Sequence, residues 1–242
     1  MNTNPFIALF KSPRKSRLAV LIDPDKYNPD LVKLCDKSAV TCVLLGGSRL
    51  EHGNVHATAL KIKKLTRKPV ILFPGDENQL TRAADGVLLP LLLSGRNADY
   101  LGGKQVLMAP RIKKFQLPVT PLGYLLIDGG RESATQQVTG TQPMNPQDLE
   151  LITDTALACQ YMGCKAVYLE AGSGASHTVH ARIIRNVKHV LEVPLIAGGG
   201  VDSAKKARAL VNAGADLVVV GNALEKDVTL LESLNPIFKS RS

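Results

Sequence analysis

The segment that decides the fold covers residues 195–222 and reads LIAGGGVDSAKKARALVNAGADLVVVGN. It begins with the apolar run 195–197, turns through glycines, and ends with a second apolar run at 217–220. Between the runs, Asp202 is placed to cap a helix with one apolar face, and Gly214 stands where that helix would end. The segment therefore predicts a strand, a helix and a second strand parallel to the first.

The same alternation of apolar runs and helical stretches extends over the whole chain of 242 residues. The runs are continuously apolar, as expected of parallel strands that helices cover on their outer face. We predict strands at 18–23, 40–45, 70–73, 86–89, 119–126, 166–170, 195–197 and 217–220. Eight strands over this length favour an α/β fold, a single-domain TIM-type (β/α)8 barrel over residues 1–242, rather than an open sheet.

Two stretches depart from a regular barrel. Between Phe73 and Asp85 there are too few residues for two loops and a full helix, so we expect the third helix to be short or missing. The polar stretch 128–141, DGGRESATQQVTGT, predicts an excursion or flexible loop after the fifth strand. A further helix is expected to start at Asn145, with Pro146 at its first helical position.

Composition excludes several classes of protein. Hydrophobic residues make up 45% and charged residues 21%, which is typical of a globular chain and not of a disordered one. No apolar run of about 18 residues is present to form a transmembrane helix, and residues 1–17 lack the apolar core and cleavage site of a secretory signal. We expect reduced thiols and a cytoplasmic location, because no C-x-x-C pair occurs among Cys35, Cys42, Cys159 and Cys164.

The net charge of +9 is unevenly distributed. Residues 1–70 contain 13 Lys and Arg against 5 Asp and Glu, whereas residues 71–242 contain 17 against 16. Nucleic acid is a poor partner for this charge, because the chain has no Trp, 4% aromatic residues and no stacking platform or recognition helix. The basic segment could instead face an anionic membrane surface or an anionic substrate. The simplest interpretation of the densest basic run is a solvated helix face, with attraction to anionic lipid as the alternative: Lys61, Lys63, Lys64, Arg67 and Lys68.

Three glycine-bearing turns each follow a strand in the last third of the chain. They cover residues 168–174 (YLEAGSG), 198–202 (GGGVD) and 221–223 (GNA). Glycine lets a ligand approach the backbone closely, and free N–H groups at the start of a helix favour anions. In (β/α)8 barrels phosphate commonly binds on the loops after the last two strands. Together the turns predict a site for a phosphorylated small molecule, although each alone would also suit a tight strand-to-helix turn.

Carboxylates and a hydroxyl are expected at the same end of the barrel as these turns. Asp23 and Asp25 come at the end of the first strand, and Ser48 follows the second in a Gly-Gly-Ser turn. Such oxygens beside a phosphate site suit Mg²⁺ bridging to phosphate, whereas the alternative for Asp23 is to cap a helix or end the strand. Glu170 ends the apolar sixth strand, where a carboxylate is a candidate general base.

The histidines favour no metal site. His52 and His56 are four residues apart and His177 and His180 three apart, but neither pair has a third ligand at metal spacing. Because the second pair opens a predicted helix, we interpret it as solvated surface.

These motifs, in this order, resemble the geranylgeranylglyceryl phosphate synthases and the wider family that includes the heptaprenylglyceryl phosphate synthases. The resemblance covers about residues 18–228, and YLEAGSG at 168–174 is its most specific part. The other matching segments are LIDPDK at 21–26, LLGGS at 44–48, AGGGV at 197–201 and VGNA at 220–223. It implies a modified (β/α)8 barrel without the third helix, which agrees with the short interval after Phe73.

The resemblance implies a Mg²⁺-dependent prenyltransferase. The enzyme would join sn-glycerol 1-phosphate to a polyprenyl diphosphate through an ether bond and release diphosphate. Asp23 and Ser48 would hold Mg²⁺ against the donor diphosphate, and Glu170 would accept the proton of the glycerol hydroxyl. Glycerol phosphate would be held by the three turns, through Tyr168, Leu169, Glu170, Ala171, Gly172, Ser173, Gly174, Gly198, Gly199, Gly200, Gly221 and Asn222. It further implies ether phospholipid biosynthesis by a homo-oligomer in the cytoplasm, in peripheral contact with the membrane.

One substitution bears on the length of the donor. Where heptaprenyl-type relatives carry a lysine two residues before the first aspartate, this chain has Leu21. The IDPDK start and the DGGR segment also resemble the geranylgeranyl branch, so a geranylgeranyl donor is favoured.

The residues leave two other classes of function open. A barrel isomerase or aldolase acting on a sugar phosphate would share the phosphate turns, but Lys165 lies at the wrong end of the sixth strand for a Schiff base. A basic protein that only binds anionic surfaces is the non-enzymatic alternative, and its binding would vanish at moderate salt.

Overall fold

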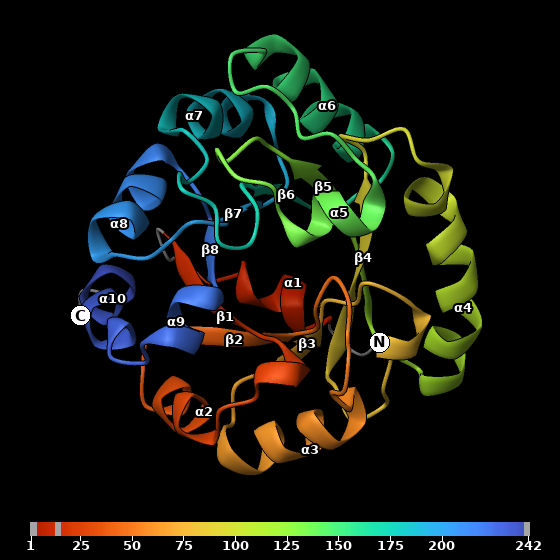
Figure 1. Ribbon diagram of the computed structural model, residues 1–242, viewed down its shortest axis with the longest axis vertical. Coiled ribbons are helices and arrows are strands. Elements are labelled where there is room, and N and C mark those ends of the chain that lie inside the picture. The colour runs from red at the N-terminus through yellow and green to blue at the C-terminus, as the bar shows by residue number, and fades with distance from the viewer. Residues whose placement is uncertain (1–3, 13–15, 240–242) are drawn as a thin grey trace.

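The computed structural model in Figure 1 describes residues 4–12 and 16–239 as a closed barrel of eight parallel strands surrounded by helices. Each strand pairs with its neighbours in chain order, and β1 closes the barrel against β8. The strands are β1 (Arg17–Ile22), β2 (Val40–Leu45), β3 (Val70–Leu72), β4 (Gly86–Leu92), β5 (Val119–Leu126), β6 (Ala166–Glu170), β7 (Leu195–Gly198) and β8 (Leu217–Val220). The predicted α/β barrel is confirmed.

Most helices cover the outside of the barrel (Figure 1). The longer ones are α2 (Pro29–Asp36), α3 (Val55–Leu65), α4 (Lys104–Phe115), α6 (Leu149–Tyr161), α7 (Ala181–Val190), α8 (Ala204–Ala213) and α10 (Leu230–Phe238). The short ones are α1 (Pro5–Leu9), α5 (Ala134–Thr139) and α9 (Asn222–Lys226), with 3₁₀ turns η1 (Pro24–Lys26) and η2 (Glu77–Gln79) and the π-helical turn η3 (Asp99–Gly103). No helix in the described parts of the chain has the length and apolar character needed to span a bilayer.

The strands are continuously apolar because both of their faces are buried. Leu18 and Val20 of β1 pack outward against the helices, whereas Ala19 between them packs into the barrel interior. Burial on both faces removes the alternation of polar and apolar residues that a half-exposed strand would show. The strands could therefore be predicted from their apolar runs, with few errors at the strand ends.

Helix α1 closes the end of the barrel at which the strands begin. Phe6, 1% exposed, joins the cluster of side chains in the barrel interior. Asn4 caps the helix by accepting the Phe6 N–H at 3.0 Å, and its Nδ2 donates to the Val119 carbonyl at 2.9 Å. The sequence pattern did not predict α1, because five residues are too few to show a helical period. Residues 1–3 and 13–15 of the segment expected not to be a secretory signal lie outside the described residues.

The helix that would follow β3 in a regular barrel is missing, as the sequence predicts. The helix labelled α3 lies before β3. The interval between β3 and β4 is fully described, and its one helical element is the three-residue turn η2. Asp76 starts this turn by accepting the Asn78 N–H at 2.8 Å. Of the three residues of η2, one side chain is buried, that of Gln79.

Two predicted helix starts are wrong. Asn145 does not cap α6: its Oδ1 accepts the Gln147 N–H at 3.0 Å, forming a separate turn before the helix begins. Asp202 does not cap α8. Ser203 accepts the Lys206 N–H in that position, and the Asp202 carboxylate instead pairs with the Lys206 ammonium at 2.8 Å. Short polar side chains next to a helix start compete for the same role, and sequence alone does not separate neighbours.

The excursion at 128–141 is not an unstructured loop, because it contains α5. Ser133 caps this helix by accepting the Gln136 N–H at 3.1 Å, and Gly140 ends it in the left-handed conformation. Tertiary contacts hold it in place: Asn97 Nδ2 donates to the Thr139 carbonyl at 2.9 Å. In Figure 1, α5 lies beside the ends of β4 and β5.

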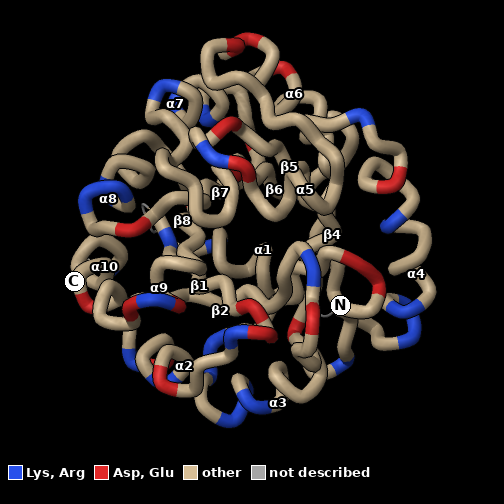
Figure 2. The backbone as a smooth tube through the Cα atoms, in the orientation of Figure 1, with Lys and Arg blue, Asp and Glu red and all other residues tan. Residues whose placement is uncertain are grey.

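The charged residues are concentrated on the segments outside the barrel (Figure 2). On α3 and the turn after it, Lys61, Lys64 and Arg67 are exposed, and Lys63 pairs with Asp85 at 2.5 Å. This agrees with a solvated helix face.

Candidate functional site

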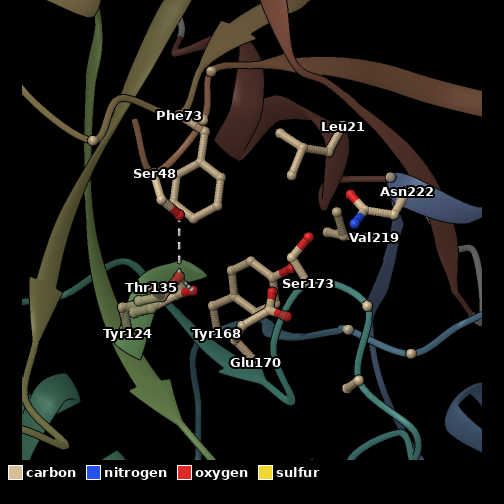
Figure 3. A pocket seen from close by; sticks show the side chains of 18 of the residues that line it. Leu21, Ser48, Phe73, Tyr124, Thr135, Tyr168, Glu170, Ser173, Val219 and Asn222 are labelled. Atoms are coloured by element: carbon tan, nitrogen blue, oxygen red, sulfur yellow. Dashed lines mark hydrogen bonds between the residues drawn. The ribbon is translucent and has the colours of Figure 1, made fainter. Parts of the chain in front are cut away.

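A pocket opens at the carboxyl ends of the strands, and all eight strands or the loops that follow them contribute to its wall (Figure 3). One end is formed by the glycine turns after β6, β7 and β8. The other end is lined by apolar and aromatic side chains, those of Phe73, Pro74, Pro90, Leu92, Tyr100 and Val138. The pocket therefore joins a small polar site to an apolar cleft.

The three glycine turns lie at one end of the pocket, where the turns after β6 and β7 pack directly on one another. Gly199 has a φ of 84°, and a Cβ there would lie 2.7 Å from the Gly172 nitrogen and 2.8 Å from the Ala171 nitrogen. The turns after β6 and β7 are thus in backbone contact that only glycine allows. A Cβ added to Gly174 would meet nothing closer than Asn222 Nδ2 at 3.9 Å, so open space remains between these two residues of the pocket wall.

The predicted substrate-binding residues fall into two groups. Those that line the pocket are Tyr168, Glu170, Ser173, Gly174, Gly199, Gly200, Gly221 and Asn222. Leu169, Ala171, Gly172 and Gly198 are not part of its wall. Leu169 and Ala171 pack outward under the helices, because alternate residues of a strand point to opposite faces.

Glu170 is a buried carboxylate at the end of β6, 7% exposed. Its Oε1 accepts the Gly172 N–H at 2.8 Å. Burial raises the pKa of Glu170 above its ordinary value, and hydrogen bonds from the Tyr168 hydroxyl and the Gly172 N–H partly oppose that rise. The carboxylate is therefore a proton acceptor of increased basicity that faces the pocket (Figure 3).

Three aromatic rings form the floor between the two ends of the pocket. Tyr168 lies 5.4 Å from Tyr124 and 5.7 Å from Phe73, measured between ring centroids, and Phe73 lies 5.8 Å from Tyr124. Burial raises the pKa of both tyrosines well above the usual range, and the nearby Glu170 charge adds to this. Both phenols therefore remain protonated and available as hydrogen-bond donors.

Ser48 and Asp23 lie together beside the loop after β2. Ser48 lines the pocket, and so does its neighbour Gly47. Asp23 is not part of the wall, but its carboxylate lies 3.5 Å from the position of a Cβ on Gly47. Its Oδ1 also accepts the Asp25 N–H at 3.0 Å and so caps η1, which is the alternative role considered for Asp23. Burial raises the pKa of Asp23.

Asp25 has a different role from Asp23. Its carboxylate accepts the backbone N–H groups of Glu51 and His52, each at 2.8 Å, and that of Gly53. These hydrogen bonds lower the pKa of Asp25. The Asp25 carboxylate therefore holds the loop before α3, and both of its oxygens are used in these hydrogen bonds.

The oxygen atoms near Ser48 suit a Mg²⁺ site in which the protein supplies only a few of the ligands. Mg²⁺ takes about six oxygens and commonly uses one or two carboxylates, with substrate phosphates and water supplying the rest. Asp23 Oδ2 makes no hydrogen bond within the described chain, and Ser48 adds a hydroxyl. No cluster of three His, Cys, Asp or Glu side chains suited to a metal occurs among residues 4–12 and 16–239. The residues fit a Mg²⁺ ion that shares most of its ligands with a bound phosphate group.

Several residues of the pocket were not predicted from the sequence. Thr135 reaches in from α5, and its Oγ1 lies 3.3 Å from Ser48 Oγ and 3.5 Å from Tyr124 Oη (Figure 3). Lys226 is the one Lys or Arg that lines the pocket within the described chain, where it forms no ion pair. Its spacing of four from Asn222, one helical turn, is the signal that would have found it. Thr135 had no such signal, because α5 was not predicted.

Two of the five histidines make local hydrogen bonds that hold the fold. His56 Nδ1 lies 2.6 Å from Thr81 Oγ1, and His180 caps α7 by accepting the Arg182 N–H at 3.2 Å. The four cysteines are free and buried.

The chain matches known proteins over nearly its full length. The family described as the PcrB family matches residues 12–238. The geranylgeranylglyceryl phosphate synthase of Zunongwangia profunda is 44% identical over 216 residues, which are 87% of this chain and 92% of that protein. The enzyme of the same name from Pyrococcus horikoshii is 38% identical over 228 residues, 92% of this chain and 89% of that protein.

A solved structure agrees with these relatives. The (S)-3-O-geranylgeranylglyceryl phosphate synthase of Thermoplasma acidophilum, crystallised with its substrate sn-glycerol-1-phosphate, superposes with a TM-score of 0.88 at 30% identity and covers 98% of both chains. Thiamine phosphate pyrophosphorylase from Pyrococcus furiosus shares only the fold, at a TM-score of 0.57 and 16% identity. Both the sequence match and the shared barrel lead to the same assignment, and the chain belongs to the PcrB family.

Proposed function

We propose that the protein transfers a geranylgeranyl group from its diphosphate to sn-glycerol 1-phosphate. The observation that carries the proposal is the buried Glu170 carboxylate, which stands between the glycine turns and the apolar end of one pocket. An enzyme that joins a small phosphate to a long isoprenoid needs a site for the phosphate, an apolar cleft for the isoprenoid and a base near the bond that forms. The relatives named geranylgeranylglyceryl phosphate synthase support the assignment of both substrates.

The reaction forms one bond and breaks another at the same prenyl carbon. The glycerol hydroxyl oxygen bonds to prenyl C1, the bond from C1 to the diphosphate oxygen breaks, and the hydroxyl proton passes to Glu170. A carboxylate with a raised pKa accepts this proton more readily than an exposed one would. The Tyr168 hydroxyl and the Gly172 N–H hold Glu170 in place as it does so.

Asp23 and Ser48 would hold Mg²⁺ at the donor end. When bound, the ion neutralises charge on the diphosphate and makes it a better leaving group. The aromatic and apolar wall from Phe73 to Tyr100 then receives the first part of the prenyl chain. Removing each CH₂ of the chain from water contributes roughly 0.8 kcal/mol.

The glycine turns and Lys226 would hold the glycerol phosphate. Backbone N–H groups around Gly174, Gly200 and Gly221 supply donors without charge, and Lys226 adds one positive charge at the pocket edge. That charge matters because two carboxylates, Glu170 and Asp202, face the same end of the pocket.

Contact with an anionic membrane surface would bring the enzyme to its lipid donor. The excess of Lys and Arg in residues 1–70 supports this part of the proposal, because this segment includes α2, β2 and α3, and both helices lie on one side of the barrel. Basic residues near an anionic surface attract it by about 1 kcal/mol each.

Incubation with Mg²⁺, sn-glycerol 1-phosphate and geranylgeranyl diphosphate tests the proposal. We expect release of diphosphate with formation of an ether-linked phosphate of the combined mass, and a rate about 10²–10⁴-fold lower for Glu170→Gln. Full activity of Glu170→Gln would show that Glu170 is not the general base. Turnover of a sugar phosphate in place of the prenyl donor would favour the isomerase or aldolase alternative.

A further inference from the structure

Gln79 is a buried amide that contacts a single residue of the neighbouring loop with both of its polar atoms. It is 1% exposed and lies in η2, the turn that replaces the third helix. Its Nε2 donates to the Gly47 carbonyl at 2.8 Å, and its Oε1 accepts the Gly47 N–H at 3.1 Å. Burying an amide is unfavourable unless its donors and acceptors are satisfied, so these two bonds explain why the polar side chain is tolerated there.

The loops after β2 and β3 also approach each other closely through their backbones. A Cβ on Gly75 would lie 2.6 Å from the Gly47 oxygen and 2.7 Å from the Ser48 oxygen, and a Cβ on Gly46 would collide with the Phe73 carbonyl oxygen. A three-residue turn buries little apolar surface to fix its neighbour. Gln79 therefore supplies the side-chain anchor that a packed third helix would otherwise provide.

Gly47 lies between this anchor and the Asp23 carboxylate. Gln79 holds both of its backbone polar groups, and the Asp23 carboxylate lies 3.5 Å from the position of a Cβ on Gly47. The next residue is Ser48, whose hydroxyl belongs to the pocket. Any movement of Gly47 changes the separation of the Asp23 carboxylate and the Ser48 hydroxyl.

We propose that Gln79 is a positioning residue that sets this separation in advance for a Mg²⁺-bound diphosphate. The inference rests on the proposed function, which assigns Asp23 and Ser48 to the donor diphosphate. Fixing such groups before the ligand arrives removes an ordering cost from binding. The glycerol phosphate end stands on β6, β7 and β8, across the pocket, so loss of Gln79 affects the two substrates unequally.

The variant Gln79→Met has a similar side-chain length and lacks both hydrogen bonds. We expect its KM for geranylgeranyl diphosphate, and the Mg²⁺ concentration at half-maximal rate, to rise about tenfold. Its KM for glycerol phosphate should change less than about twofold. Calorimetric titration of inorganic diphosphate with Mg²⁺ should show the same tenfold loss of affinity without any turnover. Gln79→Asn, too short to span both groups of Gly47, replaces it if Gln79→Met does not fold.

Gln160→Met is the matched control. Gln160, near the end of α6, also holds a loop by accepting the N–H groups of Glu192 at 2.8 Å and Val193 at 3.3 Å. That loop leads into β7 at the end of the barrel opposite the pocket. Both variants should lower the melting temperature, and only the Gln79 variant should weaken diphosphate binding. Equal diphosphate affinity in Gln79→Met and wild type, or an equal rise of both KM values, would overturn the inference.

The experiment separates this inference from the proposed function. A wild-type protein that forms no ether product refutes the proposed function. The calorimetric comparison still decides the role of Gln79, because it measures diphosphate binding alone.

Discussion

At Glu170 the protein keeps a carboxylate out of water, next to a phenol and a backbone N–H that donate to it. Burial makes the group more basic, and the two donors keep part of the ionised form available. Activity that depends on ionised Glu170 should therefore fall as the pH drops through a pKa above that of an exposed glutamate. Two predictions follow from this balance.

Removing the Tyr168 hydroxyl shifts the balance toward the protonated acid. In Tyr168→Phe the pKa of Glu170 should rise further, so the acidic limb of kcat/KM moves to higher pH than in wild type. Tyr124→Phe is the control, because the Tyr124 hydroxyl lies against Thr135 in the same ring cluster. Profiles of kcat/KM against pH measure both. An acidic limb that moves equally in the two variants would mean that the Tyr168 hydroxyl has no specific effect on Glu170.

At a pH where Glu170 is ionised, its buried charge should also lower the free energy of unfolding. Its pKa is raised in the folded state, so its contribution to stability is fully present below the unfolded pKa and is lost as the pH rises through the folded pKa. Glu170→Gln should therefore melt higher than wild type at pH 8, by about 2–4 °C if the gain is on the order of 1 kcal/mol. At pH 4 the two proteins should melt alike. A variant less stable than wild type at pH 8 would contradict this prediction.

At the scale of the elements, the short helix α9 extends the pocket wall beyond the strands. Asn222, at its first residue, and Lys226, at its last, both line the pocket. Nearby, the ion pair between Lys26 and Glu225 at 3.2 Å links this helix to η1. The helix therefore places a cation at the end of the pocket that the glycine turns form.

Lys226→Ala should weaken glycerol phosphate binding. Because the side chain is exposed and screened by solvent, we expect a modest rise of its KM, about three- to tenfold, that shrinks at high salt. Lys205→Ala, an exposed lysine of α8 outside the pocket wall, is the control. Steady-state kinetics with each substrate varied in turn gives the result. A rise in the KM for geranylgeranyl diphosphate alone would place Lys226 at the donor end instead.

The elements also explain what could be predicted from the sequence. Asp23, Ser48 and Glu170 directly follow or end strands, and the closed parallel barrel brings all such positions to one rim. The missing helix was predictable because chain length limits what fits between two strands. Thr135 and Gln79 reach the pocket region from a short helix and a 3₁₀ turn whose positions depend on tertiary hydrogen bonds. Local sequence patterns carry no information about such contacts.

At the scale of the whole molecule, the excess positive charge and the glycine turns belong to different parts of the barrel. The excess positive charge lies in the first 70 residues, whereas the glycine turns stand on β6, β7 and β8. In Figures 1 and 2, α2 and α3 carry many of these basic residues on one outer side. The excess charge is therefore suited to contact with an external surface, as the proposed membrane contact requires.

We expect the protein to bind anionic vesicles more tightly than neutral ones, with binding lost at high salt. Charge reversal of two exposed residues of α3, Lys61→Glu with Lys64→Glu, should reduce this binding about tenfold or more. The same change of charge at Lys113 and Lys114, exposed in the last turn of α4, is the control. Vesicle flotation measures each. Equal affinity for neutral and anionic vesicles would contradict the membrane contact.

Prenyl transfer to glycerol phosphate is tested most directly by the mass of the product formed from a series of donors. Diphosphates of prenyl chains from about 10 to about 35 carbons would each be incubated with Mg²⁺ and sn-glycerol 1-phosphate, and the lipid products weighed by mass spectrometry. The apolar pocket end and the match to geranylgeranylglyceryl phosphate synthases predict an ether-linked phosphate, formed fastest from geranylgeranyl diphosphate. Absence of an ether product at every chain length would contradict the account.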